Sequence, residues 1–304
     1  MSGKSILVVV DPGGERHHAL ERAGWLAERM GATVELFACD YDSSVDSGFV
    51  ASVWSPEPGP RERILFARRR QLEELAAPLR ARGVSVAVDV VWDFPFDEAI
   101  VRKVAATRPW LVAKDTEHHN IVQRTLLTNT DWHLIRHCSA PLWLVKPRAL
   151  AARPRILAAV DPVHEHDKPV ALDDAIFRFA KMFTKYADGD LEILHAFALP
   201  MDLELPPDVR ELVLREHREA MMVFIETYGI PRESVHLVEG RAHECLQRAA
   251  VEHSADVVVM GAIARRGLSR VFIGSTAERV LDRLPCDLVI VKPVSLPSPS
   301  PAAI

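Results

Sequence analysis

The sequence contains the same pattern twice, about half a chain apart. The first half opens with ILVVVDP at residues 6–12, and the second with ILAAVDP at residues 156–162. The first copy closes with CSAPLWLVKP at residues 138–147, and the second with LPCDLVIVKP at residues 284–293. Similar strand-like text at both ends of two half-chains indicates a tandem duplication. The fold must therefore be one that can be built twice and joined by the short segment 148–154.

Chain length agrees with this division. At roughly 100–200 residues per domain, 304 residues make two domains. The end, PVSLPSPSPAAI, is rich in Pro and Ser and cannot form a packed core. We expect a first domain over residues 1–149, a second over 150–293 and a disordered tail over 294–304.

Each half alternates strand-like and helix-like text. Short runs of Val, Ile and Leu are typical of buried parallel strands, and amphipathic stretches separate them. The predicted strands are 6–10, 33–37, 85–91, 110–113 and 142–145, then 156–160, 191–195, 234–238, 257–260 and 288–291. The predicted helices are 17–30, 61–81, 96–106, 171–186, 208–228, 242–252 and 276–284. This alternation predicts an α/β fold with two tandem, doubly wound, five-stranded parallel-sheet domains. If the strand order in each is 3-2-1-4-5, a crevice lies between the first and fourth strands.

Composition excludes several classes of protein. The chain has 37 Lys and Arg against 42 Asp and Glu, so its formal net charge is −5, whereas nucleic acids and anionic membranes attract basic surfaces. No apolar run approaches the roughly 18 residues of a membrane span, and the first apolar run is too short for a signal peptide. The four cysteines lie far apart, which argues against a zinc ribbon or a disulfide scaffold. We expect a cytoplasmic protein with reduced thiols and no nucleic-acid or membrane partner.

The candidate binding site lies in the second half. Ligands of doubly wound sheets bind beyond the carboxyl ends of the strands, where the strand order reverses. Asp161 and Pro162 follow the first strand, and Gly261 ends the fourth. The segment Gly274-Ser275-Thr276 opens a helix, whose first N–H groups favour an anion. Arg265 and Arg266 lie between them and could neutralise phosphates, while Asp161 could accept a hydrogen bond from an adenine amine or a ribose hydroxyl.

Each of these features also has a purely structural interpretation. Gly261 could simply end a strand. The run from Ser275 to Glu278 fits a capping box. Arg265 and Arg266 could lie in a solvated loop.

The arrangement as a whole resembles a known family. An Asp after the first strand, then Gly261-x-x-Ala264, nine residues and Gly274-Ser275, is similar to the nucleotide-binding pattern of the universal stress proteins. VVWDFPFDEAI (residues 90–100) and TDWHLIRHCSAPLWLVK (residues 130–146) resemble tandem members of that family, and the likeness covers nearly the whole chain.

The resemblance implies the universal stress protein, or adenine nucleotide alpha hydrolase-like, fold and a stress-response role. It implies ATP or another adenine nucleotide in the second domain only. It also implies that strands 142–145 and 288–291 pair with each other, so that the chain forms a pseudo-dimer; a homodimer stays open. The implied nucleotide-binding residues are Asp161, Pro162, Ala196, Phe197, Gly261, Ala264, Arg265, Arg266, Gly274, Ser275 and Thr276.

Both halves depart from the family pattern. Ala264 replaces the second loop glycine, so its methyl group is expected to weaken binding, since glycine allows a positive φ and close approach. In the first half, Asp11 and Pro12 persist but the motif glycines do not. A carboxylate at Asp115 would repel a phosphate, so this half is expected to serve folding, pairing or a different ligand. Aligning Thr130 with Thr276 places Asp115, His118, Thr128 and Asn129 opposite Gly261, Ala264, Gly274 and Ser275.

No catalytic or metal motif was found. The sequence lacks a G-x-S-x-G elbow, a P-loop and an H-E-x-x-H helix. We interpret residues 164–167 (His-Glu-His-Asp) as a polar loop, and His133 and His137 as a helix surface. We therefore expect no catalytic residues and no metal beyond nucleotide-bound Mg²⁺. Two alternatives stay open: a nucleotide-hydrolysing enzyme on the same scaffold, and a binder of a non-nucleotide, apolar ligand.

Overall fold

The fold was analysed in a computed structural model of the chain. The structure describes residues 4–11, 14, 17–46, 58–116, 128–163, 171–199, 206–262 and 284–293. The predicted tail therefore lies outside the described residues. So does the predicted helix over 276–284, of which only Leu284 is described.

The first half supplies five strands and five helices among these residues. The strands are β1 (Ser5–Val9), β2 (Thr33–Asp40), β3 (Val86–Trp92), β4 (Leu111–Asp115) and β5 (Leu142–Val145). The helices are α1 (His18–Met30), α2 (Ser43–Asp46), α3 (Pro60–Ala81), α4 (Phe96–Thr107) and α5 (Asn129–His137). Helix α1 ends at Gly31, whose φ of 64° is the left-handed conformation that glycine adopts without strain.

The second half repeats this order. Its strands are β6 (Arg155–Ala159), β7 (Asp190–Phe197), β8 (Val235–Glu239), β9 (Val257–Gly261) and β10 (Asp287–Val291). Its described helices are α6 (Ala171–Ala187), α7 (Pro207–Tyr228), the short 3-10 helix η1 (Arg232–Ser234) and α8 (Ala242–Glu252).

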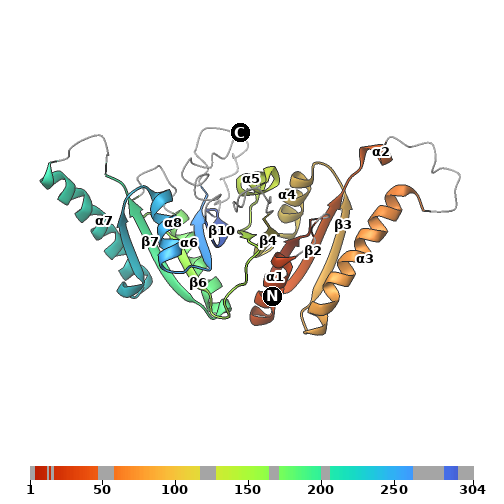
Figure 1. Cartoon of the computed structure of the whole chain (residues 1–304), viewed down its shortest axis with the longest axis horizontal. Coiled ribbons are helices and arrows are strands. Elements are labelled where there is room, and N and C mark those ends of the chain that lie inside the picture. Colours follow the sequence, from red (N-terminus) through yellow and green to blue (C-terminus); the bar gives the residue numbers. More distant parts are fainter. Residues whose placement is uncertain are drawn as a thin grey trace, which may run out of the picture.

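All ten strands form one open sheet in the order β3-β2-β1-β4-β5-β10-β9-β6-β7-β8. Each half therefore has the strand order 3-2-1-4-5, and the order of the second half runs in the reverse direction along the sheet. Figure 1 shows the halves side by side, with α3 and α7 at the two far ends. Within the described residues, no helix has the length and apolar character that crossing a bilayer requires.

The sheet is continuous because β5 and β10 pair with each other. They run antiparallel, with Leu288 opposite Leu144 and Ile290 opposite Leu142, whereas the other strand pairs are parallel. The predicted contact between strands 142–145 and 288–291 is thus confirmed. Pairing protects two apolar edges that would otherwise be exposed to other chains.

Two strands are three residues longer than predicted. β2 continues to Asp40 and β7 to Phe197, beyond the predicted ends at Phe37 and His195. The added residues find partners on the neighbouring strand, since Asp40 pairs with Trp92 and Phe197 with Glu239. The prediction ended both strands too early, because the apolar residues that follow, Ala38 and Cys39 in β2 and Ala196 and Phe197 in β7, also belong to them.

Each face of the sheet has its own core, and both cores run through the two halves. Helices α1, α3, α6 and α7 cover one face, and α4, α5 and α8 cover the other. Strand β5 shows the alternation: Trp143 and Val145 belong to the first core, and Leu142 and Leu144 to the second. Because both cores continue from one half into the other, separating the halves would expose part of each core.

A buried polar cluster stabilises the junction between the two halves, which we call the seam. The Asp287 side chain, from β10, is fully buried and forms an ion pair with Arg22 of α1. Its two oxygens also accept hydrogen bonds from Trp143 Nε1 at 3.0 Å and from the backbone N–H of Lys146 at 2.9 Å. Burial, and secondarily the charge of Arg148, lower the pKa of Arg22 to about 10, so its guanidinium remains charged at neutral pH.

Candidate functional site

The predicted crevice lies at the carboxyl edge of the second half, beside β6. This strand pairs with β7 on one side and β9 on the other, so the strand order reverses there. Asp161 follows β6, Ala196 and Phe197 end β7, and Gly261 ends β9. The fold therefore brings these four predicted residues to one edge, at the place where doubly wound sheets bind ligands.

Asp161 is positioned by the helix that follows it. Its backbone N–H donates to Asp173 Oδ1 at 3.0 Å, and Asp173, in the first turn of α6, is 3% exposed. Asp161 itself is half-buried, as is Pro162. The contact ties the loop after β6 to α6.

Gly261 has a packing role. A Cβ atom built on it would lie 2.7 Å from Leu172 Cδ2, closer than side chains tolerate. Leu172, at the start of α6, is 1% exposed. A larger residue here would force the buried Leu172 side chain to shift, so glycine favours the close approach of helix α6 to the sheet, whatever the crevice binds.

Phe197 lies beneath the edge and not in an open pocket. It is 2% exposed and stacks on His217 of α7, with ring centroids 4.6 Å apart. His217 Nδ1 lies 2.8 Å from His195 Nε2, and His195 Nδ1 lies 3.1 Å from the carbonyl oxygen of Val160. Ala196, by contrast, is half-buried. Of the two β7 residues, only Ala196 has surface to offer a ligand.

The rest of the predicted motif lies outside the described residues. This applies to Ala264, Arg265, Arg266, Gly274, Ser275 and Thr276, and to His118 and the polar run 164–167. Their assignment to the nucleotide stays a prediction from the sequence.

The corresponding edge of the first half is occupied by the protein's own carboxylates. Asp115 Oδ1 accepts a hydrogen bond at 2.9 Å from the backbone N–H of Ala19, in the first turn of α1. Burial is the main cause that raises the pKa of Asp115. A carboxylate thus takes one of the N–H groups that would otherwise be open to an anion.

The start of α5 is filled in the same way. Thr128 and Asp131 form a capping box, in which the Thr128 hydroxyl accepts from the Asp131 N–H and the Asp131 carboxylate accepts from the Thr128 N–H. Asp131 also forms a buried ion pair with Lys114, at 2.9 Å. This helix start corresponds to Gly274-Ser275 in the alignment of the two halves. The capping box takes up the N–H groups of Thr128 and Asp131, and Lys114 is paired with the Asp131 carboxylate, so this helix start offers a phosphate less attraction.

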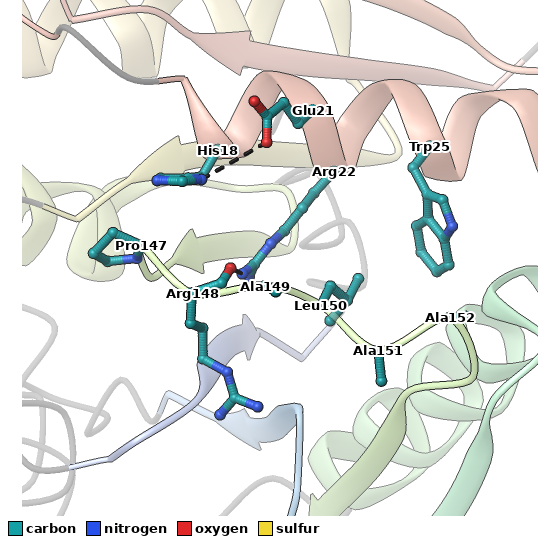
Figure 2. A pocket seen from close by; sticks show the side chains of 10 residues that line it. All are labelled: His18, Glu21, Arg22, Trp25, Pro147, Arg148, Ala149, Leu150, Ala151 and Ala152. Carbon is teal, nitrogen blue, oxygen red and sulfur yellow. Dashed lines mark hydrogen bonds and ion pairs between the residues drawn. The ribbon is translucent and has the colours of Figure 1, made fainter.

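A second concavity lies at the seam. A pocket of about 490 Å³ opens between α1 and the connecting segment 147–152. Figure 2 shows Arg22 and Trp25 extending from α1 toward that segment, with His18 paired to Glu21. Its cationic groups are engaged within the protein, because Arg22 pairs with Asp287 and Arg148 pairs with Asp256 at 2.8 Å. Neither arginine is left to attract an anionic ligand.

The cysteines do not form a nucleophilic site. All four are buried as free thiols, and burial raises the pKa of Cys39 and of Cys286 to about 11. Burial also raises the pKa of Cys138 and of Cys245. Because the thiolate is the reactive form, these groups are inert at neutral pH.

We expect thiol labelling to show this directly. Native protein treated with a disulfide exchange reagent at pH 7.5 should expose fewer than one reactive thiol per chain. The same protein in denaturant should expose all four. A thiol that reacts rapidly in the native protein would contradict the burial described above.

One cluster of chemically active side chains was missed by the sequence analysis. Glu192, His236 and His253 lie within 4.8 Å of one another, measured between one ligand atom of each. No motif spacing joins these positions along the chain. Only the pairing of β7 with β8 and the end of α8 bring them together.

The comparisons with known proteins agree with the fold just described. The Universal stress protein family matches residues 3–146 and 153–292, once in each half. The chain therefore belongs to the universal stress protein family, with two tandem domains. It is 30% identical over 307 aligned positions to Universal stress protein E of Escherichia coli K12 and to that of Salmonella typhi. These alignments cover 97% of this chain and 96% of each relative.

Solved structures give the same picture. A functionally unknown protein from Pseudomonas aeruginosa PAO1 superposes with a TM-score of 0.78 at 28% identity, covering 96% of this chain and 94% of that one. A universal stress protein from Archaeoglobus fulgidus DSM 4304 superposes with a TM-score of 0.66 at 17% identity, covering 96% and 99%. The second likeness concerns the fold alone.

Proposed function

We propose that the protein is a non-catalytic stress-response protein that binds an adenine nucleotide, with ATP as the expected ligand, in its second domain. The observation that carries the proposal is the difference between the two carboxyl edges. In the second half Asp161, Ala196 and Gly261 meet at the switch point. In the first half Asp115 and Asp131 engage the helix starts beside the corresponding edge.

The adenosine is expected over the ends of β6 and β7, near Asp161 and Ala196. The phosphates are expected at the helix start at Gly274-Ser275, since N–H groups and the helix dipole favour anions. Arg265 and Arg266 would lie over the phosphates. Cytoplasmic location accompanies this proposal, because ATP is a cytosolic ligand and the relatives matched over the full chain are named as stress proteins.

The first test replaces Gly274 with Val. A branched side chain where the phosphate approaches should abolish ATP binding, while the fold survives. Isothermal titration of wild type and of Gly274→Val measures the affinities, with circular dichroism as the folding control. Absence of ATP binding by wild type would reject the proposal. Equal affinity in both proteins would place the ligand elsewhere.

Stoichiometry tests the asymmetry between the halves. Native mass spectrometry of the full chain with ATP should show one nucleotide bound per chain. Like charges at contact range cost on the order of a kcal/mol in water and more as water is excluded, so the first-half edge should stay without nucleotide. Two nucleotides per chain would show that Asp115 and Asp131 do not block that edge.

A further inference from the structure

The strongest unassigned feature is the cluster of Glu192, His236 and His253. Glu192 Oε2 lies 3.0 Å from His236 Nε2 and 2.8 Å from His253 Nδ1. The two imidazole rings are 4.0 Å apart, centroid to centroid. Each of the three side chains is about one quarter exposed, so the cluster is reachable from solvent but partly enclosed. We propose that these three residues bind a divalent transition-metal ion of the Zn²⁺ type.

The fold holds the three donors on one face of the sheet. His236 of β8 is opposite Leu194 of β7, and Glu192 is two residues before Leu194, so Glu192 and His236 project to the same side. Helix α8 packs on that side, and His253 directly follows its last turn, with its N–H donating to the carbonyl of Ala249. Three separate elements thus fix the donors.

The site is separate from the nucleotide edge. Glu192 is near the beginning of β7, and Phe197 ends the same strand. Five residues of strand correspond to roughly 16 Å. Metal binding here is therefore independent of the function proposed above, and neither test decides the other.

The donor chemistry selects the ion. Two imidazole nitrogens and one carboxylate oxygen are ligands that Zn²⁺ accepts, with a water molecule in the fourth position. Mg²⁺ and Ca²⁺ prefer sets made of oxygens. In a tetrahedral zinc site with bonds of about 2.0–2.2 Å, neighbouring donors lie about 3.4 Å apart. Here the Glu192 oxygen already lies 2.8 Å from the His253 nitrogen and 3.0 Å from the His236 nitrogen, so small side-chain rotations are enough to admit the ion.

The first domain shows what fills the equivalent place there. Its Glu35 and Asp89 occupy the positions of Glu192 and His236. Between those two carboxylates lies the ammonium group of Lys103, 2.5 Å from Glu35 and 2.8 Å from Asp89. The strand register establishes this correspondence. Glu35 pairs with Leu7 as Glu192 pairs with the equivalent Leu157. Asp89 pairs with Phe37 as His236 pairs with the equivalent Leu194.

The second domain has no ammonium group at that position. Helices α4 and α8 are both followed by a residue with positive φ, Arg108 at 47° and Ser254 at 48°. When Arg108 and Ser254 are aligned, Lys103 is equivalent to Ala249, because each lies five residues earlier. Ala249 carries only a methyl group and is 3% exposed. The first domain therefore carries its own cation on a side chain. The second replaces one carboxylate by an imidazole, adds His253, and presents a set of donors suited to an external cation.

The test uses the full chain after removal of metal with a chelator. Zinc chloride is titrated calorimetrically, and native mass spectrometry counts the ions bound. We expect one tight Zn²⁺ per chain and no comparable response to Mg²⁺. Replacing one ligand, His236→Gln, should weaken zinc binding at least about 100-fold, because even residues that only orient a ligand contribute 10–100-fold. Cobalt substitution should give the absorption of a tetrahedral ion, which the variant loses.

Two matched controls identify the site. Glu35→Gln changes the equivalent carboxylate of the first domain and should leave zinc binding unchanged. His133→Gln removes one of the two neighbouring imidazoles of α5, whose centroids are 4.4 Å apart, and should also leave it unchanged. Should His236→Gln unfold, as judged by circular dichroism, Glu192→Gln replaces it in the comparison. No zinc binding by wild type, or equal binding by folded His236→Gln and wild type, would overturn the proposal.

Discussion

Replacing Asp287 with Ala should cost the protein about 3–5 kcal/mol of unfolding free energy, the range for breaking a buried ion pair by removing one partner. The carboxylate is fully buried and its removal leaves the guanidinium of Arg22, which is 5% exposed, without its counter-charge. The indole N–H of Trp143 and the backbone N–H of Lys146 lose their acceptor as well. Unsatisfied buried donors add to the cost. Urea denaturation of the full chain measures the change.

The exposed pair Arg153–Asp190 provides the control. It is also an Arg–Asp ion pair, at 2.6 Å, but its side chains are 68% and 50% exposed. Asp190→Ala should therefore lose at most about 1 kcal/mol. If Asp287→Ala were no more destabilising than Asp190→Ala, the buried cluster would not be what fastens the seam.

Separating the halves should have the second large effect. Residues 1–149 and 150–304, expressed alone, should be insoluble or form homodimers, whereas coexpressed halves should purify together. Each half alone exposes a strand that is buried in the intact chain, β5 or β10. Trp143, which is 0% exposed and lies edge-on to Phe183 of α6 at 5.1 Å, would lose its cover. Size-exclusion chromatography with light scattering distinguishes these states.

Contacts away from the strands strengthen this expectation. Lys4 donates to the Tyr186 hydroxyl at 2.6 Å, and Trp110 stacks on Phe179 at 5.3 Å, both across the seam. These contacts are lost when the two halves are separated. Two soluble, monomeric halves without affinity for each other would contradict the shared core.

Much of this architecture could be predicted from the sequence, because the signals are local and repeated. Continuous apolar runs mark the buried strands. The apolar character of the two closing strands, 142–145 and 288–291, together with the family resemblance, predicts that they pair. The same reasoning brought Asp161 and Gly261 to one edge, since the carboxyl ends of parallel strands meet there.

What could not be predicted depends on partners distant in the chain. Arg22 looks like a surface residue of an amphipathic helix, and nothing near it in the sequence indicates its pairing with Asp287. The convergence of Glu192, His236 and His253 likewise depends on strand register and on where α8 ends. Phe197 was placed near the ligand, but successive residues of a strand point to opposite faces, and its side chain contacts His217 below the edge.

The covalent link between the halves also makes their association independent of protein concentration. Two separate chains that paired through their closing strands would dissociate as their concentration fell, whereas a linked pair keeps a fixed local concentration however little protein is present. Strands β5 and β10 are already committed to each other, so they are closed to exchange with another copy. Each half needs to fit only one permanent neighbour. Mutations at one carboxyl edge can therefore accumulate without being copied into the other, and a single chain can keep two pockets of unlike chemistry in a constant one-to-one ratio.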